Sequence, residues 1–177
     1  SAIYGNHAGT VFFASPQGVF SHSVSFSPNR QLQTLMPADK LGAAQVVSLY
    51  ADGKNTLWAG SFGSGMRIKD LTSGTVFTLN EKQGLLNDNV LSITGWAGRV
   101  YAATLAGISE FDVTQTWPCK PLRKLPLGFN YCIGADTLDG KLWVGTDGDG
   151  LVSVLPDFSL QKMKTGPANV YSLAVYS

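Results

Sequence analysis

The sequence predicts an all-β protein built from a repeated four-stranded unit, and three observations carry this prediction. One strand recurs four times as an aliphatic residue, an aromatic residue and then small residues that end in a hydroxyl. A glycine and an apolar residue follow each copy after a short turn. The aromatic positions, Phe12, Trp58, Tyr101 and Trp143, lie 46, 43 and 42 residues apart. A period in the low forties with several strands per copy is typical of β-propeller blades.

The strand that precedes each aromatic strand repeats as well. One small residue recurs within it, as Ser48, Ser92, Cys132 and Ser172. Small residues are expected there because the innermost strands of a propeller converge on its axis. The four aromatic side chains are expected to fill the interfaces between blades, because a fixed place in every repeat favours a core role over a sugar-stacking role.

The repeat divides the chain into blades at about residues 1–45, 46–89, 90–129 and 130–169, and residues 170–177 begin a fifth. Glycine in the connecting turns supplies the positive φ that tight hairpins need. The long connection 27–45 holds an edge strand at most, and Pro37 interrupts a short helix there. Four blades allow three arrangements: they are part of a larger propeller, they close into a ring alone, or they pair with a second chain. We favour the first arrangement.

The amino-acid composition is that of a globular protein and argues against several classes of partner. Hydrophobic residues make up 44% of the 177 residues and charged residues 14%, which is typical of a globular core. A formal charge of +1 gives no reason to expect nucleic acid or an anionic membrane as a partner. Cys132 sits at the small-residue position, where a buried free thiol is expected; a disulfide with Cys119 is the alternative.

Candidate ligand residues lie in the loops between second and third strands and between successive blades. They are Phe62, Asn87, Asp88, Asp147 and Asp149. The Asp147–Gly150 turn lacks the further acids of a calcium loop, so a plain glycine-rich turn is favoured. Nothing else in the chain has metal-ligand or cofactor-binding spacing, so we expect neither a metal nor a cofactor.

A basic cluster lies in the outer segment of the third blade. It consists of Lys120, Arg123 and Lys124 beside Trp117. The cluster could meet an anionic oligosaccharide or a protein partner, although a solvated outer edge protected by charge and proline is favoured. No nucleophile motif of the G-x-S-x-G type is present, so we expect no enzymatic activity from this chain.

Three phrases of the sequence resemble the two-component regulator propeller repeat. They are GLLNDNVLSI at 84–93, LWVGTDGDGLV at 142–152 and LWAGS at 57–61. The chain departs from the family pattern at Leu86, where the family prefers proline, and at Phe12 and Tyr101, where it prefers tryptophan. The resemblance covers essentially the whole chain and implies a propeller from the periplasmic or extracellular sensor region of a hybrid histidine kinase.

The resemblance also implies a function. It suggests a non-catalytic ligand-sensing module of a bacterial two-component receptor that recognises a carbohydrate, with any kinase elsewhere in the protein. Its partners would be an oligosaccharide and neighbouring blades or a second copy of the chain, without membrane contact from this segment. Two alternatives are a structural or protein-interaction propeller and a carbohydrate-active enzyme, because propellers host many functions.

Overall fold

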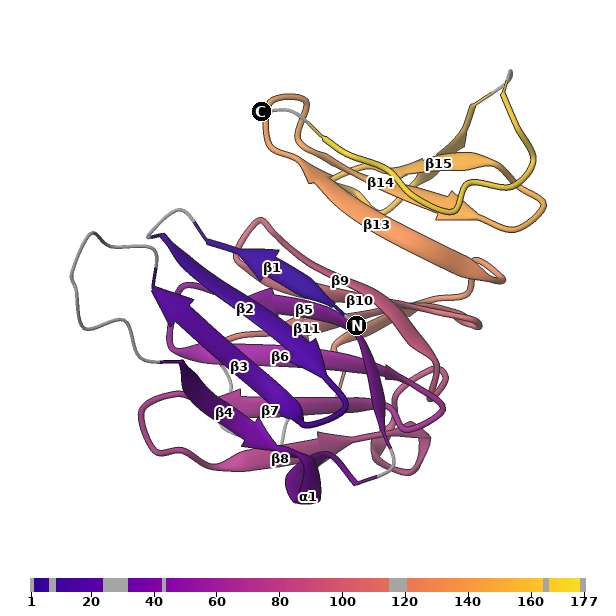
Figure 1. Cartoon of the computed structure of the whole chain (residues 1–177). Helices are drawn as coiled ribbons and strands as arrows, with labels where there is room; N and C mark the ends of the chain where they lie inside the picture. Colours follow the sequence, from indigo (N-terminus) through magenta and orange to yellow (C-terminus); the bar gives the residue numbers. More distant parts are fainter. Residues whose placement is uncertain are drawn as a thin grey trace.

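Four antiparallel sheets of four strands make up the protein (Figure 1). The structure is a computed structural model, and it describes residues 2–6, 9–23, 32–42, 44–114, 121–163 and 166–175. In each sheet the strands are paired in the order in which they occur in the chain. This is the predicted all-β arrangement of four four-stranded blades.

Each blade contains four consecutive strands. Blade 1 has β1 (Ile3–Gly5), β2 (Thr10–Ser15), β3 (Gly18–Ser23) and β4 (Gln33–Pro37). Blade 2 has β5 (Gln45–Ala51), β6 (Thr56–Phe62), β7 (Met66–Asp70) and β8 (Val76–Leu79). Blade 3 has β9 (Val90–Trp96), β10 (Arg99–Thr104), β11 (Gly107–Asp112) and β12 (Arg123–Leu125). Blade 4 has β13 (Asn130–Asp136), β14 (Lys141–Thr146), β15 (Leu151–Val154) and β16 (Leu160–Lys162).

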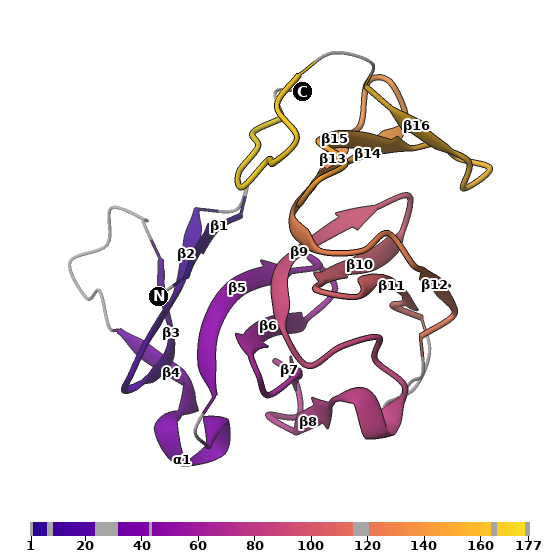
Figure 2. The same ribbon diagram turned by 90° about the vertical axis from the view of Figure 1, so that its right-hand side faces the viewer.

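The blades follow one another side by side, with their first strands innermost (Figure 2). β5 contacts both β1 and β9, and β9 contacts β13. The small residues of these strands lie where the next blade approaches. The Ser92 hydroxyl accepts a hydrogen bond from the Ile133 N–H at 3.2 Å, and the Cys132 thiol donates to the Val170 carbonyl at 3.6 Å. Cys132 is a free, buried thiol, as expected for the small-residue position. Cys119, its partner in the disulfide alternative, lies outside the described residues.

A hydroxyl and a glycine close the hairpin between the second and third strands. The hydroxyls of Ser61 and Thr146 donate to the carbonyls of Gly65 and Gly150 at 2.8 and 2.9 Å. Gly65 has φ +67°, and a Cβ there would lie 2.2 Å from the Leu79 carbonyl oxygen. The repeated pattern of hydroxyl, turn and glycine is therefore a requirement of the hairpin geometry.

Apolar side chains between successive blades form three core clusters. Phe12, Trp58 and Tyr101 are at most 5% exposed, as predicted for blade interfaces. Trp143 is only half-buried, which differs from the expectation. Blade 3 covers Trp58, whereas the described residues that cover the corresponding face of blade 4 belong to one segment, 170–175.

Segment 166–175 lies against blade 4. The Val170 N–H donates to the Thr146 carbonyl at 3.0 Å, and a Cβ on Gly145 would collide with Val170. Gly60 of blade 2 has the same relation to Val90, at the start of the next innermost strand. Residues 170–175 thus occupy the place of an innermost strand without forming a sheet, and the fifth blade stays a prediction.

In the described ranges, two short helices lie between strands. Helix α1 (Ala38–Leu41) begins directly after Pro37, which serves as its N-cap residue and therefore delimits the helix instead of interrupting it. The 3₁₀ helix η1 (Glu81–Gln83) is closed by a capping box between Asn80 and Gln83. Among the described residues, no helix has the length and apolar character needed to span a bilayer.

Candidate functional site

Hairpins and blade connections meet at one end of the blades, which we call the loop face. The Gly65 N–H donates to the Asp88 carbonyl at 2.8 Å, and the Gly150 N–H donates to the Ala168 carbonyl at 2.7 Å. Each bond ties the hairpin of one blade to the connection that leads to the next blade. Loops from consecutive blades are therefore held together, as a binding surface on this face requires.

Two tyrosines lie next to each other on the loop face of blade 4. Tyr131 belongs to β13 and Tyr171 to the segment that follows blade 4, and their ring centroids are 4.8 Å apart at an angle of 45°. Tyr171 is 65% exposed. The β13–β14 register skips Tyr131, because Asn130 and Cys132 pair with consecutive residues of β14. The same bulge recurs at Val47 of β5 and Leu91 of β9, so it is a feature of the repeat that sets the direction of the side chain at this position.

Polar groups surround the tyrosine pair. The Tyr131 hydroxyl donates to Asp147 Oδ2 at 3.1 Å. The Asn169 side chain connects the two loops, since its Oδ1 accepts from the Gly148 N–H at 2.9 Å and its Nδ2 donates to the Tyr171 hydroxyl at 3.5 Å. Partial desolvation and the Asp147 carboxylate raise the pKa of Tyr131, so this phenol stays a hydrogen-bond donor.

A cavity of about 470 Å³ lies between the same two loops. The hairpin residues Gly148–Leu151 line one side, and Met163, Pro167 and Ala168 line the other. Its volume falls within the roughly 300–1,000 Å³ that is usual for small-molecule sites. The two tyrosines, Asp147 and Asn169 do not line this cavity but belong to the same two loops, and the candidate site consists of these four side chains with the cavity beside them.

Two predicted ligand residues belong to this site: Asp147 bonds to Tyr131, and Asp149 lines the cavity. Asp149 lies in the same hairpin, but its carboxylate accepts a bond from Lys162 Nζ at 2.6 Å. The turn shows the glycine-rich geometry that was favoured, with positive φ at Gly148 and Gly150. Among the described residues, no three His, Cys, Asp or Glu side chains lie close enough together to hold a metal ion.

The other predicted loop residues lie in blade 2 and its connection to blade 3. Phe62 ends β6 and is 55% exposed. The Asn87 amide and the Asp88 N–H both donate to Glu81, at 3.1 and 3.0 Å, and Asp88 in turn accepts from the Glu81 N–H. Asn87 and Asp88 thus stabilise their own loop, and the structure gives them no contact with the tyrosine pair.

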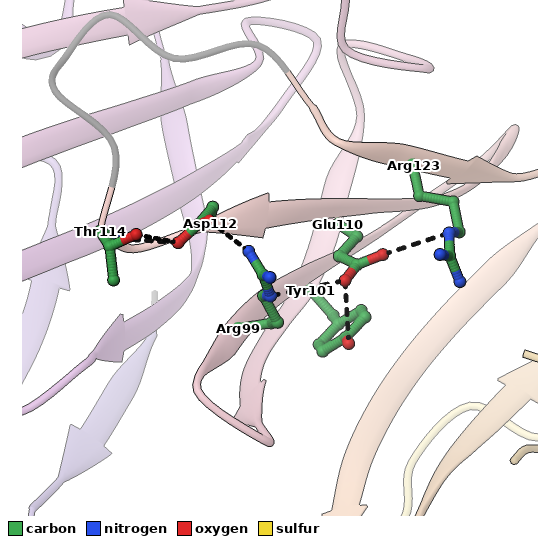
Figure 3. A network of polar contacts seen from close by, with 6 residues as sticks. All are labelled: Arg99, Tyr101, Glu110, Asp112, Thr114 and Arg123. Atoms are coloured by element: carbon green, nitrogen blue, oxygen red, sulfur yellow. Dashed lines mark hydrogen bonds and ion pairs between the residues drawn. The ribbon is translucent and has the colours of Figure 1, made fainter. Parts of the chain in front are cut away.

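Arg123 and Lys124 lie on β12, the outermost strand of blade 3, whereas Trp117 and Lys120 lie outside the described residues. Arg123 pairs with the buried Glu110 at 3.7 Å, and its guanidinium lies 3.6 Å from the ring centroid of Phe158 in blade 4. Figure 3 shows that the same carboxylate also meets Tyr101 and Arg99. The guanidinium therefore has a structural role between two blades.

Sequence reasoning missed both tyrosines, although a signal exists in the repeat. The residue before the small position reads Val47, Leu91, Tyr131 and Tyr171 in successive copies. The aliphatic residues of the first two copies are replaced by aromatic ones in the last two. A change of residue type at one position of the repeat indicates a local function, because valine or leucine at that position is sufficient for the fold.

No family model and no curated protein sequence matches the chain. Solved structures do match it. The extracellular domains of two hybrid two-component systems of B. thetaiotaomicron, BT3049 and BT4673, are 16% and 17% identical, with TM-scores of 0.70 and 0.69 over 98% and 94% of this chain. The WD40 repeats of RRP9 are 14% identical, with a TM-score of 0.68 over 91% of this chain.

The chain is a set of β-propeller blades. It spans 22% of the length of each B. thetaiotaomicron domain and 49% of the RRP9 repeats. The fold agrees with the resemblance to the two-component regulator propeller repeat, because extracellular domains of two-component systems share it over nearly the whole chain. At these identities the likeness concerns the fold, and function depends on the site.

Proposed function

We propose that the protein is a non-catalytic, ligand-sensing propeller module of an extracellular or periplasmic two-component receptor, and that it recognises a carbohydrate. The main support is the exposed Tyr131–Tyr171 pair beside Asp147 and Asn169. The apolar face of a sugar ring packs on aromatic rings, while its hydroxyls bond to carboxylate and amide groups. The likeness to extracellular domains of two-component systems supports the sensor role.

The tyrosine pair also suggests how binding is sensed. Tyr131 belongs to blade 4 and Tyr171 to the following segment, so a ligand that contacts both rings bridges two successive units of the repeat. A ligand changes an equilibrium only through different affinities for its two states. A bridging ligand favours the state in which the two units lie together, and this preference is the signal.

A thermal-shift screen of neutral oligosaccharides, followed by calorimetry, tests this function. A ligand should raise the melting temperature without being converted, and Tyr171→Ala should weaken its binding at least about tenfold, equivalent to about 1.4 kcal/mol. Leu138→Ala is the matched control, because Leu138 is 79% exposed in the β13–β14 turn. Equal binding by both variants would exclude the tyrosine site, and chemical turnover would favour an enzyme.

A protein-interaction propeller is the second candidate. The observation that favours it is the apolar outer face of blade 1, where Ile3 is 76% exposed and Phe13 stacks on Phe20 at 5.5 Å. An exposed apolar sheet face is typical of an interaction surface. A screen without any stabilising saccharide, together with association through this face, would favour this candidate.

A further inference from the structure

Two cationic side chains of β7 face blade 1. Arg67 donates to the carbonyls of Ser64 and Leu41 at 3.0 and 3.3 Å. Lys69 Nζ donates to the Leu35 carbonyl at 2.6 Å. Within the described ranges, neither cation forms a salt bridge. Carbonyl groups are neutral, so among the described residues no carboxylate pairs directly with either cation in the seam between blades 1 and 2.

A cavity of about 460 Å³ lies beside Lys69 in this seam. Blade 1 contributes residues of β2, β3 and β4, and blade 2 contributes the end of β7 and the turn before β8. Phe12 and Leu35 form part of its buried floor, being 5% and 6% exposed. Of the described residues that line the cavity, Lys69 alone is charged.

Hydroxyl groups line the same cavity as Lys69. Four lining residues have hydroxyls that form no hydrogen bond with any other part of the described chain: Thr10, Ser21, Thr34 and Thr72. Ser21 is only 8% exposed. Its hydroxyl oxygen is not one of the solvent-excluded side-chain atoms that lack a partner, so solvent and small molecules can reach it. The cavity therefore presents one cation and several free hydroxyl groups to a ligand.

We propose that this cavity binds a small carboxylate that also carries hydroxyl groups, of the uronic acid class. The carboxylate pairs with the Lys69 ammonium, and the ligand's hydroxyls exchange hydrogen bonds with Ser21, Thr34 and Thr72. A single ammonium suits one negative charge, because charge-assisted bonds to it are strong in a partly desolvated site. Phosphate is a poorer match, since no arginine lines the cavity.

This site is separate from the tyrosine pair. β7 runs from the Phe62–Gly65 hairpin on the loop face to the Leu71–Gly74 turn beside the cavity, so the cavity lies at the opposite end of the strands. It also involves blades 1 and 2, whereas the tyrosine pair involves blade 4. The two proposals can therefore succeed or fail independently.

Calorimetric titration with three probes tests the proposal. Glucuronate has the charge and the hydroxyls, glucose has the same ring without the charge, and acetate has the charge without the hydroxyls. Glucuronate should bind at least about tenfold more tightly than either, and added salt should weaken it, since screening reduces charge pairing. Undetectable glucuronate binding, or equal binding of acetate, would overturn the proposal.

Variants locate the binding site. Lys69→Gln should remove the preference for glucuronate over glucose, whereas Lys82→Gln, at an exposed lysine of η1, should retain it. Lys69→Gln also alters the bond to Leu35, so Thr72→Val serves as a second test at an exposed position. It should weaken glucuronate binding without changing the melting temperature. Loss of binding in Tyr171→Ala instead would assign glucuronate to the tyrosine site and overturn the seam proposal.

Discussion

Trp58 and Trp143 occupy the same position in two blades but have different surroundings. Trp58 is fully buried, and its ring centroid lies 5.5 Å from that of Phe111 in blade 3. Trp143 is half-buried, and its indole N–H donates to Asp136 at 3.3 Å. The contribution of the tryptophan side chain to stability therefore depends on what covers its blade. Substitutions at the two positions can be compared directly.

We expect Trp58→Ala to lower the free energy of unfolding by about 3–5 kcal/mol, because a large buried side chain leaves a cavity. Trp143→Ala should cost less, since part of its side chain remains exposed to solvent. Urea denaturation followed by circular dichroism measures both losses. Equal losses would contradict the buried interface assigned to Trp58.

Asp112 makes stability depend on pH. Bonds from Thr114, followed by the Arg99 guanidinium, lower its pKa from 3.8 to about 2. A depressed carboxylate pKa stabilises the folded state above pH 3.8, and this contribution disappears as the pH falls through about 2. Asp112→Asn should therefore reduce the melting temperature above about pH 4 but not near pH 2. A constant difference across this range would exclude the ionised pair as the cause.

A position that keeps its chemistry in all four copies predicts a residue's role where the next blade covers it, which holds for Trp58 and Tyr101 but not for Trp143. Trp58 and Tyr101 were assigned to blade interfaces on that basis, and both are buried. Tyr131 and Tyr171 were missed because they differ from Val47 and Leu91 at the same position. Their surroundings depend on the path of residues 166–175, which does not follow from local sequence.

At the scale of elements, each hairpin glycine has one of two distinct roles. Gly63 and Gly65 lie in the same turn with φ +78° and +67°. A Cβ on Gly63 would meet nothing within 4 Å, whereas one on Gly65 would collide with the Leu79 carbonyl of β8. The first glycine serves backbone conformation alone, and the second also allows close contact with the neighbouring strand.

Gly63→Ala should cost about 1–2 kcal/mol, the strain of a left-handed backbone with a Cβ. Gly65→Ala should cost clearly more, because the strand must also move. Chemical denaturation measures the free energy of unfolding of both variants, which carry the same Gly→Ala change at two positions of one turn. Similar losses would mean that β8 is free to shift away from the hairpin.

Turns and strand order could be predicted because Gly, Asp and Asn specify tight hairpins locally. The role of β12 could not. Arg123 reads as a surface cation, yet it meets Glu110 of the neighbouring strand and Phe158 of the next blade. Such pairings depend on packing between elements, which charge patterns alone do not reveal. Likewise, the predicted ligand residues Asn87 and Asp88 form hydrogen bonds with Glu81 within their own loop.

At the scale of the whole molecule, blade 1 has one covered face and one open face. Phe12 faces blade 2, whereas the row Ile3, Phe13 and Phe20 lies on the other side of the sheet. Within the part of the chain that the structure describes, no other blade packs on this row. Apolar sheet faces of this kind promote association.

The isolated chain should therefore associate as its concentration rises, and Ile3→Glu should reduce this association by placing a charge in the row. Leu138→Glu is the control, because Leu138 is equally exposed but lies in the β13–β14 turn. Sedimentation velocity over a concentration series measures both. A wild-type chain that stays monomeric throughout would contradict the expectation.

The tyrosine pair has a mechanical consequence. Tyr171 belongs to a segment that lies on blade 4 through few hydrogen bonds, and Tyr131 belongs to the sheet beneath it. A ligand bound by both rings opposes the dissociation of this segment from blade 4. The free energy of ligand binding therefore also stabilises the contact between the segment and the blade. Amide hydrogen exchange within residues 170–175 should then slow when the site is occupied, while exchange in β10 should not change. Occupancy of the site would thus hold residues 170–175 against the sheet of blade 4.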